Sequence, residues 1–298
     1  MKKGYQEFLE SLGGKRVKLN EPMRLHTTFK IGGPADIFYE VKTKEEIVAA
    51  VKLARKLKIP YFILGGGSNI LVSDKGIRGV VIKIKNEKLG MKNGRVKAEA
   101  GMSLPWLVGE TAKGGLSGLE FCAGIPGTVG GAIAGNAGIK DKWIGDLVEE
   151  VEILQEDGEK EIISKRECQF GYRQSRFLLE KEIVLGVTLK LIQNNPQSVA
   201  RRIDKYLKIR KNQPKEPSAG SVFKNPDGES AGKLIEQVGL KGYRIGDAQV
   251  SPKHANFIVN LGLAKGRDVL ELIRLCQKRV EEKFAVRLEK EIKIIGEL

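Results

Sequence analysis

The stretch YFILGGGSN at residues 61–69 decides how the fold of this chain is interpreted. Four apolar residues, 61–64, predict a short strand that runs directly into three glycines, a serine and an asparagine. A tight turn needs one glycine, whereas three allow the N–H groups of the chain to curl around a pyrophosphate, with Ser68 and Asn69 as further donors. The spacing is not that of a Rossmann GxGxxG, and no GxxxxGK(S/T) motif is present. The stretch is therefore a candidate phosphate-binding loop of another kind.

The residues on either side of this loop predict a β-α-β unit. Ile37 to Val41 is a strand candidate, and Thr43-Lys44-Glu45-Glu46 is a capping box that opens a helix. Pro60 marks the end of that helix, just before the strand at 61–64. The alternating sequence VVIKIK at 80–85 predicts one more strand.

A second glycine-rich stretch, FCAGIPGTVGGAIAGNAGI at 121–139, holds no charged residue. It is almost long enough to span a membrane, but its glycines, proline and asparagine make it too weakly apolar to insert. Exposed amides along this stretch can donate to the ring nitrogens, carbonyls or phosphates of a cofactor. We interpret it as a backbone-lined pocket wall; a buried packing seam of small residues is the alternative.

Composition excludes several classes of function. The chain has 298 residues, 41% of them apolar and 30% charged, which is typical of a folded globular protein. Its net charge of +15 has two explanations, a nucleic-acid surface or sites for small polyanions. No long basic run is present and only 6% of residues are aromatic, so we expect no nucleic-acid binding. Three cysteines without a CxxC pair and two histidines predict no metal site and a reducing compartment. Since the N-terminal residues lack an apolar signal segment, we expect a cytoplasmic protein without membrane insertion.

The remainder of the chain predicts a mixed α and β structure with a boundary near 193–196. The expected strands are 148–154, 161–164 and 183–191, with a hairpin at Asp157-Gly158. The expected helices are 196–211, 230–238 and 266–285, and the last carries a core stripe of Val269, Ile273, Cys276, Val280 and Phe284. Alternation over 289–295 predicts a closing strand with Ile292 and Ile294 on one face.

Six motifs, which together run from residue 27 to residue 296, carry a resemblance to a known family. They are TTFKIGGPAD (27–36), LGGGSNILVSDKGIRG (64–79), GLEFCAGIPGTVGGAIAGNAG (118–138), GYRQSRF (171–177), AGSVFKNP (219–226) and LEKEIKIIG (288–296). In these motifs the chain resembles the UDP-N-acetylenolpyruvoylglucosamine reductases. Only 48 positions separate Arg173 from Ser221, which resembles the shorter (type II) sub-type of the family.

The resemblance implies an α+β protein with an FAD-binding fold of the vanillyl-alcohol-oxidase type in two subdomains, followed by a C-terminal α+β substrate domain. We expect the subdomains at 1–88 and 89–195 and the substrate domain at 196–298. The implied cofactors are non-covalent FAD and, as co-substrate, NADPH. The implied partner is a small UDP-sugar, with no obligate protein partner.

The implied reaction is reduction of an enolpyruvyl ether to a lactyl ether in peptidoglycan synthesis, and thus in cell-wall biogenesis, cell shape and cell division. Hydride reaches the vinyl carbon, negative charge builds on the carboxylate, and the neighbouring carbon must be protonated. A flavin oxidase of the same fold, acting on a hydroxy acid or a sugar, is the alternative function.

The resemblance implies three catalytic residues. Arg173, in GYRQSRF, suits the developing carboxylate charge because a guanidinium is always charged and can bind in bidentate fashion. Ser221, in AGSVFKNP, is the implied proton donor, since its weak acidity suffices for a strongly basic carbanion-like centre. Glu291 is implied by its position in LEKEIKIIG; Glu289 has the same strand parity, so periodicity alone does not separate the two.

The remaining site residues are expected to bind cofactor or substrate. The cofactor-binding candidates lie in the two glycine-rich stretches: Gly65, Gly66, Gly67, Ser68, Asn69, Gly124, Ile125, Pro126, Thr128, Gly130, Gly131, Asn136 and Gly138. The implied substrate-binding residues are Tyr172, Lys224, Asn225 and His254.

Overall fold

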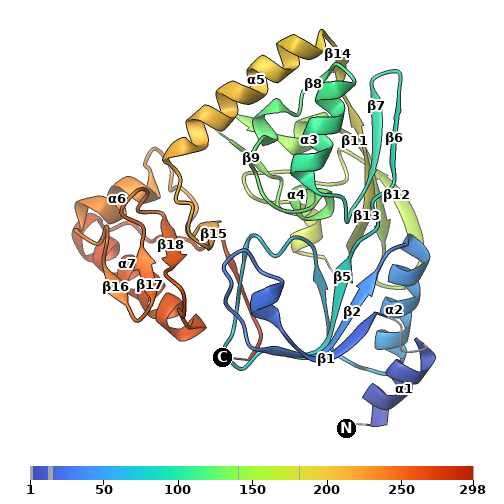
Figure 1. The fold of residues 1–298 in the computed structure, drawn as a ribbon, viewed down its shortest axis with the longest axis horizontal. Helices are drawn as coiled ribbons and strands as arrows, with labels where there is room; N and C mark the ends of the chain where they lie inside the picture. The colour runs from blue at the N-terminus through green and yellow to red at the C-terminus, as the bar shows by residue number, and fades with distance from the viewer. Residues whose placement is uncertain (1–2, 13–15, 140, 181, 298) are drawn as a thin grey trace. The chain divides into compact units, whose positions relative to one another are not determined.

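The computed structural model describes residues 3–12, 16–139, 141–180 and 182–297 (Figure 1). They group into two compact units, each assembled from three segments of the chain. The first unit comprises Met1–Val17, Tyr39–Gly66 and Val81–Lys211, and the second comprises Lys18–Phe38, Gly67–Val80 and Asn212–Leu298. The three-part division expected from the sequence, 1–88, 89–195 and 196–298, stays a prediction.

The N-terminal elements build a four-stranded sheet in the order β1-β2-β5-β3. Its strands are Val17–Pro22 (β1), Pro34–Val41 (β2), Ile77–Ile84 (β5) and Tyr61–Leu64 (β3), and the preceding helix α1 is Lys3–Ser11. Helix α2, Lys44–Lys56, begins where expected because the Thr43 side chain accepts a hydrogen bond from the Glu46 amide. The strands and helix predicted around the glycine loop are confirmed.

A five-stranded antiparallel sheet, β12-β11-β13-β7-β6, organises the rest of the first unit. Its strands are Lys160–Ser164 (β12), Val148–Leu154 (β11), Ile183–Lys190 (β13), Arg95–Glu99 (β7) and Leu89–Lys92 (β6). The predicted hairpin joins β11 to β12, with Gly158 at a φ of +91°. All three strands predicted for this region are confirmed.

Shorter elements complete the first unit. The helices are Leu104–Lys113 (α3), Val129–Ala134 (α4) and Pro196–Ile209 (α5). Two small strand pairs are Leu116–Ser117 (β8) with Ile192–Gln193 (β14), and Gly138–Ile139 (β9) with Lys142–Trp143 (β10). The charge-free stretch 121–139 thus contains one short α-helix, α4, and none of the described helices has the length and apolarity needed to cross a membrane.

The second unit packs helices against a four-stranded antiparallel sheet in the order β15-β18-β17-β16. The elements are Ser218–Ser221 (β15), Ala231–Gln237 (α6), Arg244–Ile245 (β16), Ala248–Val250 (β17), Phe257–Asn260 (β18) and Gly266–Phe284 (α7). The predicted stripe on α7 is confirmed as core: Val269, Ile273, Cys276 and Val280 are buried, and Phe284 packs against them.

The closing strand is shorter than the alternation predicted. Only Lys293–Ile295 (β19) forms a strand, paired in parallel with Ile70–Val72 (β4). The preceding residues leave the ladder because the Glu291 amide donates to the Val222 carbonyl at 2.8 Å. The segment around 290–292 therefore lies against residues 222–223 before it joins β4.

The cysteines are three free thiols at positions 122, 168 and 276, all buried. Burial raises the pKa of Cys122 and of Cys276 to about 12, and that of Cys168 to about 11. Each thiol is therefore neutral at physiological pH, which fits a packing role rather than a nucleophilic one.

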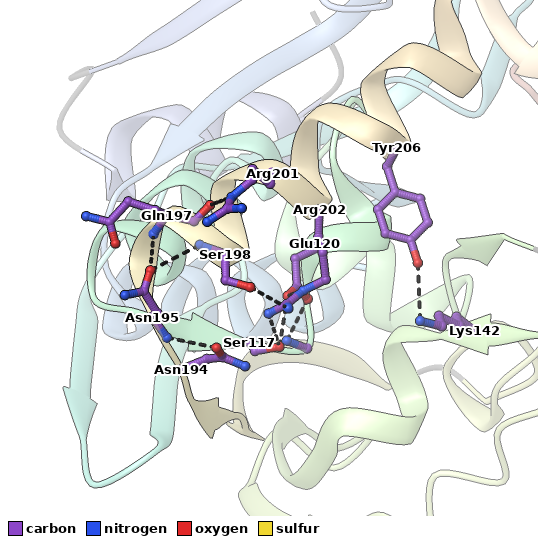
Figure 2. Close-up of polar contacts among 11 residues, drawn as sticks. Ser117, Glu120, Lys142, Asn194, Asn195, Gln197, Ser198, Arg201, Arg202 and Tyr206 are labelled. Carbon is purple, nitrogen blue, oxygen red and sulfur yellow. Dashed lines mark hydrogen bonds and ion pairs between the residues drawn. The ribbon is translucent and has the colours of Figure 1, made fainter.

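Helix α5 is attached to the first unit by a polar network near its start (Figure 2). Asn195 caps the helix, since its side-chain oxygen accepts from the amides of Gln197 at 2.9 Å and Ser198 at 3.2 Å. About two turns after the cap, the Arg202 Nε donates to the Glu120 Oε1 at 2.8 Å. The same guanidinium donates to the Ser117 hydroxyl at 3.0 Å.

Glu120 is the centre of this network and is only 6% exposed. Burial alone raises the pKa of its carboxyl, but hydrogen bonds from its own backbone, from Arg202, from the Gly118 amide and from Ser117 outweigh that effect. The net result is a pKa below the ordinary value, so the carboxylate is charged at neutral pH and holds α5 in place.

The Arg202→Met variant should lower the free energy of unfolding by roughly 1–3 kcal/mol, because it removes the charged donors of a buried carboxylate. The matched control is Arg201→Met. Arg201 is exposed, and its one hydrogen bond among the described residues goes to the Gln197 carbonyl of its own helix at 3.4 Å, so its loss should change stability by under about 0.5 kcal/mol. Urea unfolding at pH 7 measures both values.

The difference between the two variants should shrink as the pH falls below the ordinary carboxyl value of 4.5. A carboxyl with a lowered pKa contributes stability above that value and loses it as it becomes protonated. Equal destabilisation by both substitutions would contradict the assigned role of Arg202.

Candidate functional site

The loop after β3 owes its first two glycines to a close approach of backbone. A Cβ atom on Gly65 would lie 2.5 Å from the Thr128 Oγ1, and one on Gly66 would lie 2.5 Å from the Gly127 Cα. Any larger residue at these two positions would push the loop away from residues 127–128. Gly65 and Gly66 are therefore in direct contact with the second glycine-rich stretch, which the sequence did not indicate.

The second stretch combines packing with turn geometry. A Cβ on Gly130 would lie 2.8 Å from the Ala100 Cβ, so this glycine serves the packing-seam interpretation. Gly124 and Gly127 have φ values of +76° and +123°, which place their peptide groups outside regular structure. Thr128 caps α4, its hydroxyl accepting from the Gly131 amide at 3.4 Å. The packing-seam interpretation thus has support at Gly130, and the cofactor contacts of the stretch stay predictions.

Asn136 has a structural role that the sequence did not predict. Its side chain donates to the Gly171 carbonyl at 2.8 Å and accepts from the Gly145 amide at 3.0 Å. It is 3% exposed, and both ends of its amide are engaged by backbone. Asn136 therefore fixes the start of the turn that carries Arg173.

That turn is closed by reciprocal backbone hydrogen bonds between Gly171 and Gln174, at 3.0 and 3.2 Å. Arg173 lies at its tip with a φ of +53°, an uncommon conformation for a residue with a side chain. Its guanidinium lies 5.4 Å from the centre of the Trp143 ring and 6.0 Å from that of Tyr172. Cation–π attraction to both rings limits where the guanidinium can point.

Arg176, three residues later, is held quite differently. Two of its guanidinium nitrogens bind the two carboxylate oxygens of Glu182, with the Nε to Oε2 distance at 2.9 Å. This pairing raises the pKa of Arg176 and occupies two of the N–H-bearing nitrogens of its guanidinium. Arg176 is therefore committed to an ion pair within the first unit, and the role of Arg173 toward substrate stays a prediction.

Lys83 is a functional candidate that the sequence analysis missed. It is 8% exposed on strand β5, and its ammonium group donates to the Gly65 carbonyl. Burial, together with the charge of Lys85, lowers the pKa of Lys83 to about 8. In VVIKIK the two lysines share one face by parity, but Lys85 is exposed and Lys83 is not.

In the second unit, Ser221 and Glu291 lie on adjoining segments. Ser221 ends β15, and the carbonyl of the next residue, Val222, accepts from the Glu291 amide. The Glu291 carbonyl in turn accepts from the Asn69 side chain at 3.2 Å. Hydrogen bonds therefore join the segments that carry two of the expected catalytic residues and one expected cofactor residue, although these segments are far apart in the sequence.

The expected substrate residues of this unit also have partners within it. Lys224 pairs with Glu289 at 3.1 Å, which gives Glu289 a partner of its own. The Asn225 side chain accepts from the Ala231 amide at 3.1 Å, at the start of α6. The His254 Nδ1 accepts from the Asn256 amide at 3.3 Å, and burial lowers the pKa of this imidazole. Their contacts with substrate stay predictions.

Comparison with known proteins identifies two matching family models. One, described as an FAD binding domain, matches residues 35–164. The other, described as the C-terminal domain of UDP-N-acetylenolpyruvoylglucosamine reductase, matches residues 213–295.

Whole proteins match over nearly their full length. The UDP-N-acetylenolpyruvoylglucosamine reductase of Caldanaerobacter subterraneus is 48% identical, covering 97% of this chain and 96% of that protein. The enzyme of the same name from Clostridium tetani is 43% identical, with 98% of each chain covered. The crystal structure of the reductase from Thermus caldophilus matches with a TM-score of 0.82 and 42% identity, over 94% of this chain and 98% of that one.

These comparisons confirm the predicted fold class, an α+β FAD-binding fold followed by a C-terminal domain. They also confirm the resemblance that the six motifs carried. The chain belongs to the family of UDP-N-acetylenolpyruvoylglucosamine reductases.

Proposed function

We propose that this protein reduces the enolpyruvyl group of UDP-N-acetylglucosamine enolpyruvate with NADPH, giving UDP-N-acetylmuramate for peptidoglycan synthesis. The observation that carries the proposal is full-length similarity at 43–48% identity to enzymes named for this reductase activity. The alternative, a flavin oxidase of the same fold, has no comparable relative among those described above.

FAD fits the donors of the glycine loop. Its diphosphate is anionic, and the loop at 65–69 combines backbone amides with the buried cation of Lys83. When bound, FAD supplies the relay of hydride from NADPH to the substrate. We propose the two glycine-rich stretches as its binding wall, within residues 1–195, and residues 196–298 as the substrate domain.

Arg173 would bind the substrate carboxylate and stabilise the charge that develops there. Its guanidinium is held on the Trp143 and Tyr172 rings, so little reorganisation is needed when that charge appears. Ser221 would donate the proton to the adjacent carbon, and Glu291, on the adjoining segment, would orient or stabilise the reacting groups. Tyr172, Lys224, Asn225 and His254 would contact the UDP-sugar.

The excess of positive charge suits this function. FAD, NADPH and the substrate all carry phosphates, and a net charge of +15 would speed their encounter with the protein. We propose a cytoplasmic location, where NADPH and the nucleotide sugar are formed.

The overall activity has a direct test. Protein supplied with FAD should be yellow, NADPH should bleach the colour, and only the enolpyruvyl sugar nucleotide should restore it rapidly. Protein that takes up no flavin would overturn the proposal, and rapid restoration of the colour by air during turnover of a hydroxy acid would indicate the oxidase.

The Ser221→Ala variant should still be bleached by NADPH at the rate of the unaltered protein, because that half-reaction needs no proton from Ser221. Re-oxidation by the enolpyruvyl substrate should slow by about 10²–10⁴-fold, the usual contribution of a general acid. Stopped-flow absorbance measures each half-reaction. Ser218→Ala on the same strand is the control and should leave both rates unchanged; unchanged re-oxidation in the Ser221 variant would remove it as donor.

The Arg173→Met variant should slow the re-oxidation half-reaction by about 10²–10³-fold with little loss of stability. The matched Arg176→Met variant should show the reverse, a free energy of unfolding lower by about 1–3 kcal/mol and near-normal chemistry, because it leaves Glu182 unpaired. Rapid kinetics and urea unfolding of both variants give the comparison. If the two exchanged phenotypes, Arg176 would be the substrate arginine.

A further inference from the structure

The contact of Lys83 with the glycine loop has so far entered only as a positive charge near the FAD diphosphate. Lys83 lies on β5, which has β2 on one side and β3 on the other. Strand β3 ends at Leu64, and the carbonyl of the next residue, Gly65, accepts the hydrogen bond from the Lys83 ammonium group. The buried ammonium group of Lys83 is thus in contact with the carbonyl of the first residue of the loop, Gly65.

This hydrogen bond also sets the direction of an amide. In a planar trans peptide the C=O of one residue and the N–H of the next point in opposite directions. With the Gly65 carbonyl held by Lys83, the Gly66 N–H is directed away from Lys83. Gly66 is the residue whose Cα region lies against Gly127, so the peptide unit is held from two sides.

The charged groups around Lys83 leave it sensitive to pH. Burial is the largest influence and lowers its pKa, Lys85 just after β5 lowers it further, and Glu40 on β2 raises it. Strand β3 carries no charged residue. The pKa of about 8 means that the ammonium form predominates at pH 7 and is lost as the pH rises above 8.

We propose that Lys83 is a positioning residue for the cofactor, which aims the Gly66 amide at the FAD diphosphate and adds a positive charge to the loop. The proposal rests on the proposed role of residues 65–69. Two negative charges brought near the ammonium group favour its charged form, so FAD binding and protonation of Lys83 strengthen each other. FAD affinity should therefore be highest below pH 8.

The experiment is a fluorescence titration of the full-length protein, stripped of cofactor, with FAD between pH 7 and pH 9. Unaltered protein should lose affinity by up to about tenfold over this range. Lys83→Met should bind FAD at pH 7 at least about tenfold more weakly than the unaltered protein, and its affinity should not change with pH over this range. Lys83→Arg should bind tightly at both pH values, because a guanidinium stays charged.

Controls separate this role from a structural one. Lys85→Met, at the exposed residue just after β5, should bind FAD at pH 7 as tightly as the unaltered protein, and its loss of affinity should move to higher pH because one charge that lowers the pKa of Lys83 is gone. Riboflavin, which has the flavin ring and no phosphate, should bind the Lys83→Met variant as well as it binds the parent. Equal loss of riboflavin and FAD binding, or a pH dependence that survives in Lys83→Arg, would overturn the proposal. Failure of the unaltered protein to bind FAD would instead refute the proposed function.

Discussion

The backbone of residues 65–66 lies against the backbone of residues 127–128, and the first unit is arranged around this approach. Only glycine permits it, since a Cβ on Gly66 would come within 2.5 Å of the Gly127 Cα. The end of β3 and the start of α4 are thereby joined, although more than 60 residues of chain separate them. Two loops rich in peptide N–H groups are brought together as a consequence.

Such a surface recognises a ligand chiefly through main-chain donors, and few charged side chains contact it. Lys83 reaches the loop from a buried position in the sheet, and its contact is with a carbonyl rather than with a carboxylate. Arg173 is held by aromatic rings, whereas Arg176 is neutralised by Glu182. A buried cation such as Lys83 that binds a neutral carbonyl keeps more of its field for a bound anion than one that binds a carboxylate, which suits a protein whose cofactors and substrate carry phosphates.

Three pairs of residues show where sequence reasoning reached its limit. Arg173 and Arg176, Glu289 and Glu291, and Lys83 and Lys85 are each identical in type and two or three positions apart. Strand parity does not separate Glu289 from Glu291 or Lys83 from Lys85, because the members of each pair lie two positions apart. For the arginines, the preference for Arg173 came only from its position in GYRQSRF. The structure separates them by their partners: Glu182 for Arg176, Lys224 for Glu289, and the Gly65 carbonyl for Lys83.

The sequence by itself determined the local elements and the family. The strand at 61–64, the cap at Thr43, the hairpin at 157–158 and the core stripe of α7 all follow from short-range pattern, because neighbours along the chain set helix caps, turns and amphipathic faces. The six motifs determined the α+β FAD-binding fold. Only the tertiary structure decided that the two glycine stretches touch, that Asn136 holds the Arg173 turn, and that Lys83 is buried beneath the loop. Those facts depend on residues far apart in the chain, and a one-dimensional pattern carries no record of which distant backbone comes within van der Waals distance.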